Sequence, residues 1–250
     1  MATDAGSGTL DQLRSRYEAL LERLEANQSQ FQRLARSALR VQEDERRRIA
    51  RELHDGIGQN LTAIKHQLAM LQSQLREAPG AERVGACIEL CAQTHEDTRQ
   101  LSRLLRPQVL DDLGLGAALH WLARTLEGSG GLQVAVHVEE LPALDAEVQT
   151  LLFRVTQEAL ANVVKHARAS DALVRLAVRG GRVALTIWDN GEGFDVAAAE
   201  AAASQGRGSG LAGMRERLAL YGGALRIDSA PESGTWVRIS VPAGAGGAPR

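Results

Sequence analysis

The sequence is short of cysteine, aromatic residues and surplus charge. Its 250 residues include two cysteines, six prolines and 3% aromatic residues, and the formal net charge is −2. Direct binding to nucleic acid needs surplus lysine and arginine, so this balance disfavours it. No apolar run approaches the roughly 18 residues of a membrane helix, and the polar start MATDAGSGTL lacks the basic and apolar regions of a signal peptide. We therefore expect a cytoplasmic chain without a membrane span.

The two cysteines, Cys87 and Cys91, lie four positions apart in a predicted helix. Side chains at that spacing share one face of a helix, and two such residues do not make a disulfide framework. This favours core packing over a redox or metal role. With 44% hydrophobic and 24% charged residues, the chain has the balance of a globular protein and can bury a core.

A heptad pattern of apolar residues begins near the N-terminus. One seam position holds Leu10, Tyr17, Leu24, Phe31 and Ala38, and the other holds Leu13, Leu20, Asn27, Leu34 and Val41. The pattern predicts a coiled coil over residues 10–41, after a disordered start at residues 1–9. A polar Asn27 in the seam can bond its own copy across a dimer axis, which favours a parallel homodimer.

The heptad breaks at Glu45 and Arg48, and apolar residues resume in a shifted phase from Ile49 to Leu75. The shift amounts to a four-residue stutter, which locally unwinds a supercoil. Such a joint can deliver a rotation from upstream to the helix that follows, or it can simply correct the phase. The sequence leaves both interpretations open.

The long helix is predicted to end at the segment EAPGAE, and a second helix runs from about Glu82 to Leu105, before Pro107. Two antiparallel helices per chain, over residues 42–106, would form a four-helix bundle in a dimer. We interpret residues 107–129 as a linker with a short helix.

From about residue 130 the pattern changes to strands and helices in alternation. It predicts a strand at LQVAVHVEE, a helix over residues 145–166, and a β-hairpin of ALVRLAV and VALTIWD joined through Gly180 and Gly181. Two more strands follow at LRIDS and WVRISVP, after a small-residue loop over residues 196–210. The fold class is therefore α+β, with a sheet domain over residues 130–243 and a disordered tail at residues 244–250.

The segment ERRRIARELHDGIGQNL places a histidine on the first bundle helix. Leu53 and Ile57 should point into the bundle core, so His54 should face outward. A neutral imidazole is nucleophilic at neutral pH, Asp55 could bond one ring nitrogen or take its proton, and Gln59 could orient a water. Taken alone, an exposed histidine in a charged helix is more often a solvated residue.

A second set of polar residues lies in FRVTQEALANVVKHA. Glu158, Asn162 and His166 recur at four-residue spacing and so share one helix face. Oxygen ligands one turn apart suit Mg²⁺, which takes a few protein oxygens together with water and phosphate. By itself such a stripe is more often a wet helix face than a metal site.

Two glycine-rich segments follow. Asp189 to Phe194, DNGEGF, comes directly after a strand, where a carboxylate can accept a hydrogen bond from an exocyclic amine and glycines let backbone approach a flat ring. The segment GRGSGL, residues 206–211, opens a helix, and backbone N–H groups there can cradle phosphate. Each segment alone is weak evidence, because Asp-Asn-Gly is also a common turn.

The segment from Glu45 to Leu61 closely resembles the phosphoacceptor segment of histidine kinases of the NarL/DegS class, whose hallmark is His-Asp-x-x-x-Gln. The resemblance implies that His54 is phosphorylated and that Asp55 assists proton removal. It also implies that Gln59 positions the water that dephosphorylates a partner regulator.

The order of the later motifs, with Gly234-Thr235 before the last strand, resembles the ATP-binding domain shared by gyrase, Hsp90, histidine kinases and MutL, over about residues 132–242. It implies a Bergerat-type α/β sandwich that binds ATP and Mg²⁺. The implied contacts are Glu158 and Asn162 for the metal; Asp189, Gly191, Gly193 and Thr235 for adenine; Gly206, Gly208, Gly210 and Leu211 for the lid and phosphates; and Lys165 and His166 near the phosphates.

One feature departs from the more familiar kinases of this family, which carry an aromatic motif between the glycine segments. Here that stretch, residues 196–205, is short and rich in alanine. The NarL/DegS class generally shows such a stretch, and it makes the lid contacts the least defined part of the resemblance.

Together the resemblances imply a sensor histidine kinase that phosphorylates itself on His54, then transfers the phosphoryl group to an aspartate of a response regulator with a helix-turn-helix output domain. Movement about residues 107–116 would bring ATP to His54 of the same or the other protomer. Two alternatives are a degenerate dimeric scaffold, and a serine kinase or ATPase of the same ATP fold. The intact motifs argue against the first, and the acceptor helix before them argues against the second.

Overall fold

A computed structural model describes residues 4–75, 80–105, 107–127, 131–204 and 209–243, and contacts divide the chain into two units, Met1–Ile49 and Ala50–Arg250. The first unit belongs to one helix, α1 (Asp4–Glu52). Three of the predicted seam side chains on it, Leu24, Phe31 and Val41, are 57%, 72% and 65% exposed. An exposed apolar stripe of this kind is what a single strand of a coiled coil presents, and the pairing itself stays a prediction.

The predicted disordered start at residues 1–9 is wrong from Asp4 onward, because α1 begins there. Once a helix exists, each further residue adds a hydrogen bond without a new nucleation cost. The predicted disordered tail at residues 244–250 lies outside the described residues.

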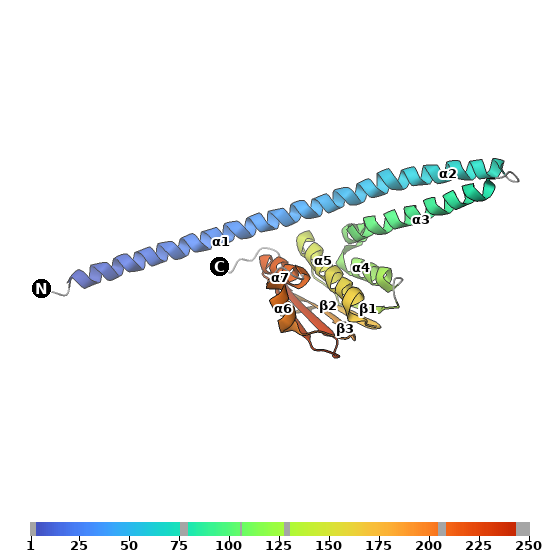
Figure 1. The fold of residues 1–250 in the computed structure, drawn as a ribbon. Helices are drawn as coiled ribbons and strands as arrows, with labels where there is room; N and C mark the ends of the chain where they lie inside the picture. The colour runs from blue at the N-terminus through green and yellow to red at the C-terminus, as the bar shows by residue number, and fades with distance from the viewer. Residues whose placement is uncertain (1–3, 76–79, 106, 128–130, 205–208, 244–250) are drawn as a thin grey trace. The chain divides into compact units, whose positions relative to one another are not determined.

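Two antiparallel helices follow α1, and Figure 1 shows α2 and α3 side by side. A π-helical segment, η1 (Leu53–Gly58), leads into α2 (Gln59–Gln74), and α3 (Ala81–Leu105) returns along it. The Ser102 hydroxyl donates to the Ala50 carbonyl over 2.9 Å, which ties the end of α3 to the start of this hairpin. None of the helices in the described ranges has the length and apolar character needed to cross a membrane.

The predicted linker over residues 107–129 is instead a helix of the sheet domain, α4 (Gln108–Glu127). Its buried residues belong to the same core as the sheet: Leu110, Leu115, Ala118, Leu119, Leu122 and Ala123. Gly114, at φ 79°, kinks the helix, and the freed Leu115 N–H donates to Oε1 of Gln149 over 3.2 Å. The sheet domain therefore begins near residue 108 rather than residue 130.

The sheet has five strands in the order β1-β2-β3-β5-β4, of which only the β1–β2 pair is parallel. The strands are β1 (Gln133–Val138), β2 (Asp171–Arg179), β3 (Arg182–Asp189), β4 (Ala224–Ser229) and β5 (Thr235–Pro242). The predicted β2–β3 hairpin is confirmed, with both turn glycines at positive φ, 57° for Gly180 and 73° for Gly181.

Helices cover one face of this sheet (Figure 1). Helix α5 (Ala146–Asn162) lies across it and ends in a π-helical turn, η2 (Val163–Ala167), while α7 (Ser209–Leu220) packs beside α5. One layer of helices on one sheet confirms the predicted α+β class with an α/β sandwich.

The predicted loop over residues 196–210 contains a further helix, α6 (Val196–Ser204). Alanine has the strongest helix propensity, and the Asp195 carboxylate caps the helix by accepting from the Ala198 N–H over 3.1 Å. Small residues in this stretch therefore give a helix rather than an irregular loop.

Candidate functional site

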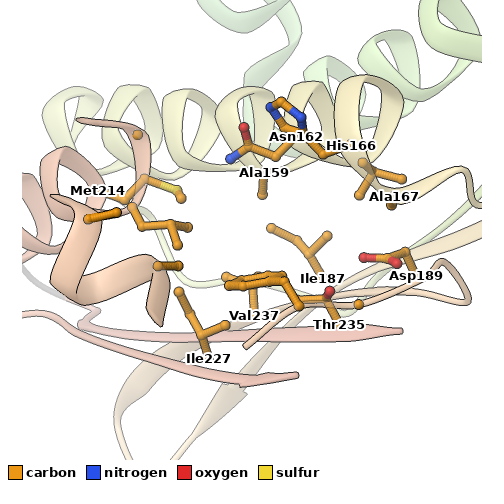
Figure 2. Close-up of a pocket in the computed structure, with 17 residues that line it drawn as sticks. Ala159, Asn162, His166, Ala167, Ile187, Asp189, Met214, Ile227, Thr235 and Val237 are labelled. Atoms are coloured by element: carbon orange, nitrogen blue, oxygen red, sulfur yellow. The ribbon is translucent and has the colours of Figure 1, made fainter. Parts of the chain in front are cut away.

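A cavity of about 390 Å³ lies between α5, α7 and the sheet (Figure 2). This volume is in the range of small-molecule sites. Most of its walls are apolar, formed by side chains such as Met214, Ile187 and Ile227. The predicted site residues that line it are Asn162, His166, Asp189, Gly193, Gly210, Leu211 and Thr235.

Asp189, at the end of β3, is 3% exposed. Its carboxylate points into the cavity (Figure 2). Its Oδ1 accepts a hydrogen bond from the Gly191 N–H over 2.9 Å, and Thr235 also bonds the carboxylate. Burial raises the pKa of Asp189 above its ordinary value, while the bonds from Gly191 and Thr235 lower it. A buried acceptor facing an apolar slot is suited to a flat heterocycle that carries an amine.

Two glycines after Asp189 allow close backbone packing. A Cβ on Gly191 would lie 2.3 Å from the Ala167 carbonyl oxygen, and one on Gly193 would lie 2.1 Å from that of Ala230. Gly193 also needs its positive φ of 63°. Gly193 lines the cavity as expected, but Gly191 does not: it packs against Ala167 and holds Asp189 through its N–H.

At the α7 side of the cavity, three residues from α5 and α7 converge. A Cβ on Gly210 would lie 2.5 Å from Glu158 Oε1 and 3.8 Å from Asn162 Nδ2. The start of α7 therefore sits directly against the two predicted metal ligands. Within the described ranges no group of three or more His, Cys, Asp or Glu side chains could hold a metal, so an ion here would take these two ligands plus oxygens from phosphate and water.

The remaining residues predicted to contact the nucleotide do not all lie at the cavity. His166 lines the cavity, whereas Lys165 is exposed and does not line it. Both lie in the π turn η2, which the regular four-residue spacing did not predict, and Arg168 at φ 49° ends it. π turns inside helices occur frequently at functional sites. Gly206 and Gly208 lie outside the described residues.

The predicted phosphoacceptor also lies in a π segment. His54 and Asp55 belong to η1, Gln59 opens α2, and all three side chains are exposed. In the single chain Leu53 is half-buried and Ile57 is 46% exposed, and their place in the core of a two-chain bundle stays a prediction. The wider turn of a π-helix changes which side chains share a face, so spacing rules for an α-helix fail here.

Sequence reasoning missed most of the apolar wall. Met214, 2% exposed, faces the cavity opposite Asp189 (Figure 2). Ile187 and Val237 reach it from neighbouring strands, and the only available signal was their inward position in alternating strands.

Comparison with known families matches two parts of the chain. Residues 45–110 match the family described as histidine kinase, and residues 147–245 match the family of histidine kinase-, DNA gyrase B-, and HSP90-like ATPases. The first match contains the π segment with His54, and the second contains the whole cavity.

Three relatives are similar over most of this chain. Sensor histidine kinase MctS of Rhizobium johnstonii is 38% identical, over 86% of this chain and 46% of its own length. The histidine-protein kinase/phosphatase UhpB of Salmonella typhimurium is 37% identical, over 95% and 45%. The oxygen sensor histidine kinase NreB of Staphylococcus carnosus is 34% identical, over 88% and 62%.

The chain thus spans about half to three-fifths of the length of these relatives. One family match covers the helical hairpin that carries the exposed His54, and the other covers most of the sheet domain that holds the cavity. The chain belongs to the sensor histidine kinases of the NarL class, with a phosphoacceptor domain followed by an ATP-binding domain.

Proposed function

We propose that this chain uses ATP and Mg²⁺ to phosphorylate its own His54 and then passes the phosphoryl group to an aspartate of a response regulator. The observation that carries the proposal is a buried carboxylate, Asp189, in an apolar cavity that Asn162 also lines, with Glu158 one helical turn before Asn162 and next to Gly210. An exposed His54 in a hairpin of the same chain supplies the acceptor.

The adenine end of the site combines apolar side chains with one hydrogen-bond acceptor. Ile187 and Met214 offer apolar surface to a flat base, while the Asp189 carboxylate accepts a hydrogen bond from its amine. Guanine carries a carbonyl oxygen where adenine has that amine. Its oxygen would face the carboxylate without a proton between them, so the site favours ATP over GTP.

The phosphate end gathers oxygen ligands and backbone donors. Glu158 and Asn162 would hold Mg²⁺, and Gly210 at the start of α7 leaves room beside them. The metal, when bound, supplies neutralisation of the charge on the phosphates. The chain's task is then to align the terminal phosphate with the acceptor.

The transfer itself needs one nucleophile and one proton acceptor. A neutral His54 nitrogen forms a bond to the γ-phosphorus as the bond to the oxygen bridging the β-phosphate breaks, and ADP leaves. The other ring nitrogen then loses its proton, and the exposed Asp55 is the neighbouring carboxylate that can take it.

ATP must reach His54 by movement of the sheet domain, in the same or the opposite protomer. The segment assigned to this movement, residues 107–116, includes Leu110 and Leu115, which are 6% and 3% exposed in the sheet-domain core. On the other side, the Leu105 carbonyl accepts a hydrogen bond from Arg154 of α5 over 2.6 Å. Movement of the sheet domain relative to the end of α3 would therefore have to break the hydrogen bond between Arg154 and the Leu105 carbonyl.

We propose a homodimer from the exposed apolar faces of the helices, and a response regulator as partner from the family. Exposed apolar residues along α1, η1 and α2, including Phe31, Ile57 and Ile64, would be covered in a homodimer. We propose a regulator with a helix-turn-helix output domain as the partner, in the cytoplasm where ATP is available. Gln59 would orient water for regulator dephosphorylation, in line with the relative named as a kinase/phosphatase.

The test is phosphate incorporation from labelled ATP into wild type, His54→Gln and the control His66→Gln. His66 is another exposed histidine on α2. Wild type and His66→Gln should gain alkali-stable, acid-labile phosphate that chases to a regulator, and His54→Gln should gain none. Equal labelling of wild type and His54→Gln would refute the assignment.

A further inference from the structure

We propose that Ser229, on β4, is a positioning residue for ATP recognition: it fixes Thr235 and the Phe194 backbone, and through them the adenine-reading Asp189. The inference rests on the proposed function, because it concerns the same nucleotide site. Ser229 is only part-buried, does not line the cavity, and belongs to none of the glycine motifs. It acts on the cavity through three neighbours.

The Ser229 hydroxyl meets three groups from separate segments. It accepts a hydrogen bond from the Phe194 N–H over 3.0 Å, and it lies 2.9 Å from the Gly234 carbonyl oxygen and 3.1 Å from Oγ1 of Thr235. Phe194 and Thr235 both line the cavity. One side chain therefore joins the loop after β3 to the β4–β5 turn at the edge of the nucleotide site.

The direction of these bonds follows from the number of protons. Thr235 has one hydroxyl proton and bonds the Asp189 carboxylate, which can only accept while ionised. The Thr235 oxygen therefore has its lone pairs left for Ser229, whose proton is directed at Thr235 or at the Gly234 carbonyl. Directed at Thr235, that proton limits the rotation of the Thr235 hydroxyl and keeps the Thr235 proton on Asp189; directed at Gly234, it holds the backbone just before Thr235 in place.

The two segments that Ser229 joins are in close backbone contact. A Cβ on Gly193 would lie 2.1 Å from the Ala230 carbonyl oxygen, and one on Gly234 would lie 2.2 Å from that of Asp189. Without the hydroxyl, the Phe194 N–H would lose this acceptor beside the cavity. An unpaired donor favours separation of the two segments so that water can enter.

The experiment compares Ser229→Ala with Ser229→Thr and a matched control, Ser240→Ala, in the full chain. Ser240 lies on the adjacent strand, and its hydroxyl accepts from Arg182 Nε over 2.7 Å, away from the cavity. We expect Ser229→Ala to weaken ATP binding in calorimetry and to raise KM, each about ten-fold, since two hydrogen bonds are lost. The kcat for autophosphorylation should stay within two-fold, and the preference for ATP over GTP should narrow.

Ser229→Thr keeps the hydroxyl and should recover most of the ATP affinity, while Ser240→Ala should bind ATP as wild type does. Equal ATP affinity and selectivity in Ser229→Ala and Ser240→Ala, whatever their melting temperatures, would overturn the proposal. If Ser229→Ala does not fold, Ser229→Cys, which keeps the size and weakens the donor, should show the same loss of affinity and would overturn the proposal by binding normally. Wild type that bound no ATP would instead refute the proposed function.

Discussion

At the scale of single residues, the site depends on a few atoms whose environment differs from that of a surface side chain. Asp189 is the clearest case, since burial raises the pKa of its carboxyl and bonds from Gly191 and Thr235 oppose that rise. Gly210 is another, because a missing Cβ leaves space for the Glu158 carboxylate. Both features lead to measurable predictions.

ATP affinity should fall with acidification through the protonation of Asp189. Its folded-state pKa is raised, so the carboxyl takes up a proton above the pH at which an exposed aspartate would, and then no longer accepts from the adenine amine. Because the folded state binds this proton more readily than the unfolded state, the contribution of Asp189 to the free energy of unfolding declines as pH rises through that range. Titrating ATP binding against pH tests this, with Asp189→Asn as a weak-binding control that should lack the Asp189 step.

Gly210→Ala should weaken Mg²⁺-dependent ATP binding with little loss of stability. The new Cβ would lie 2.5 Å from Glu158 Oε1, the free end of a flexible side chain that can move away at small cost. We expect at least a five-fold rise in the Kd of Mg·ATP and a melting temperature within a few degrees of wild type. Gly213→Ala, on the same helix with open space at its Cβ, is the control, and an equal effect in both variants would contradict the assignment.

At the scale of elements, α4 changes the description of the chain most. Its six buried residues and its kink at Gly114 make it part of the sheet-domain core. Amphipathic helices gain most of their stability from such packing rather than from propensity. The segment predicted to be a linker is therefore held in the sheet-domain core from Leu110 onward.

Leu115→Ala should destabilise the sheet domain by about 2–5 kcal/mol, the usual cost of a buried leucine truncated to alanine. Leu115 is 3% exposed, while Leu113, two residues earlier on the same helix, is 71% exposed. Leu113→Ala should change the free energy of unfolding by less than about 0.5 kcal/mol. Denaturant unfolding measures both, and equal midpoints would mean that α4 is not part of the core.

At the scale of the whole molecule, α1 exposes an apolar stripe along its length. Phe31 and Leu34 are 72% and 63% exposed, which is unusual for large apolar side chains on one face of a long polar helix. A second copy would bury them. The same coupling would place two phosphoacceptor hairpins together.

Phe31→Lys should therefore raise the Kd of the dimer by at least ten-fold. The dimer interface would lose two buried aromatic side chains and place two lysine charges next to each other. Ser29→Lys adds the same charge on the outer face of the predicted heptad and should leave the Kd unchanged. Sedimentation over a range of concentrations distinguishes the two. An unchanged dimer in Phe31→Lys would argue against the predicted seam.

The sequence by itself determined what depends on local order: a helix over residues 10–41, the β2–β3 hairpin with Gly180 and Gly181, and the polar residues Asn162 and Asp189, which do line the cavity. These features follow from periodicity, turn chemistry and motifs written in consecutive residues. Only the tertiary structure decided that α4 joins the core, that Gly191 packs away from the cavity, and that Ser229 reaches Phe194 and Thr235. Those outcomes depend on contacts between segments far apart in the chain, and spacing along a sequence carries no information about which distant backbone atoms will meet.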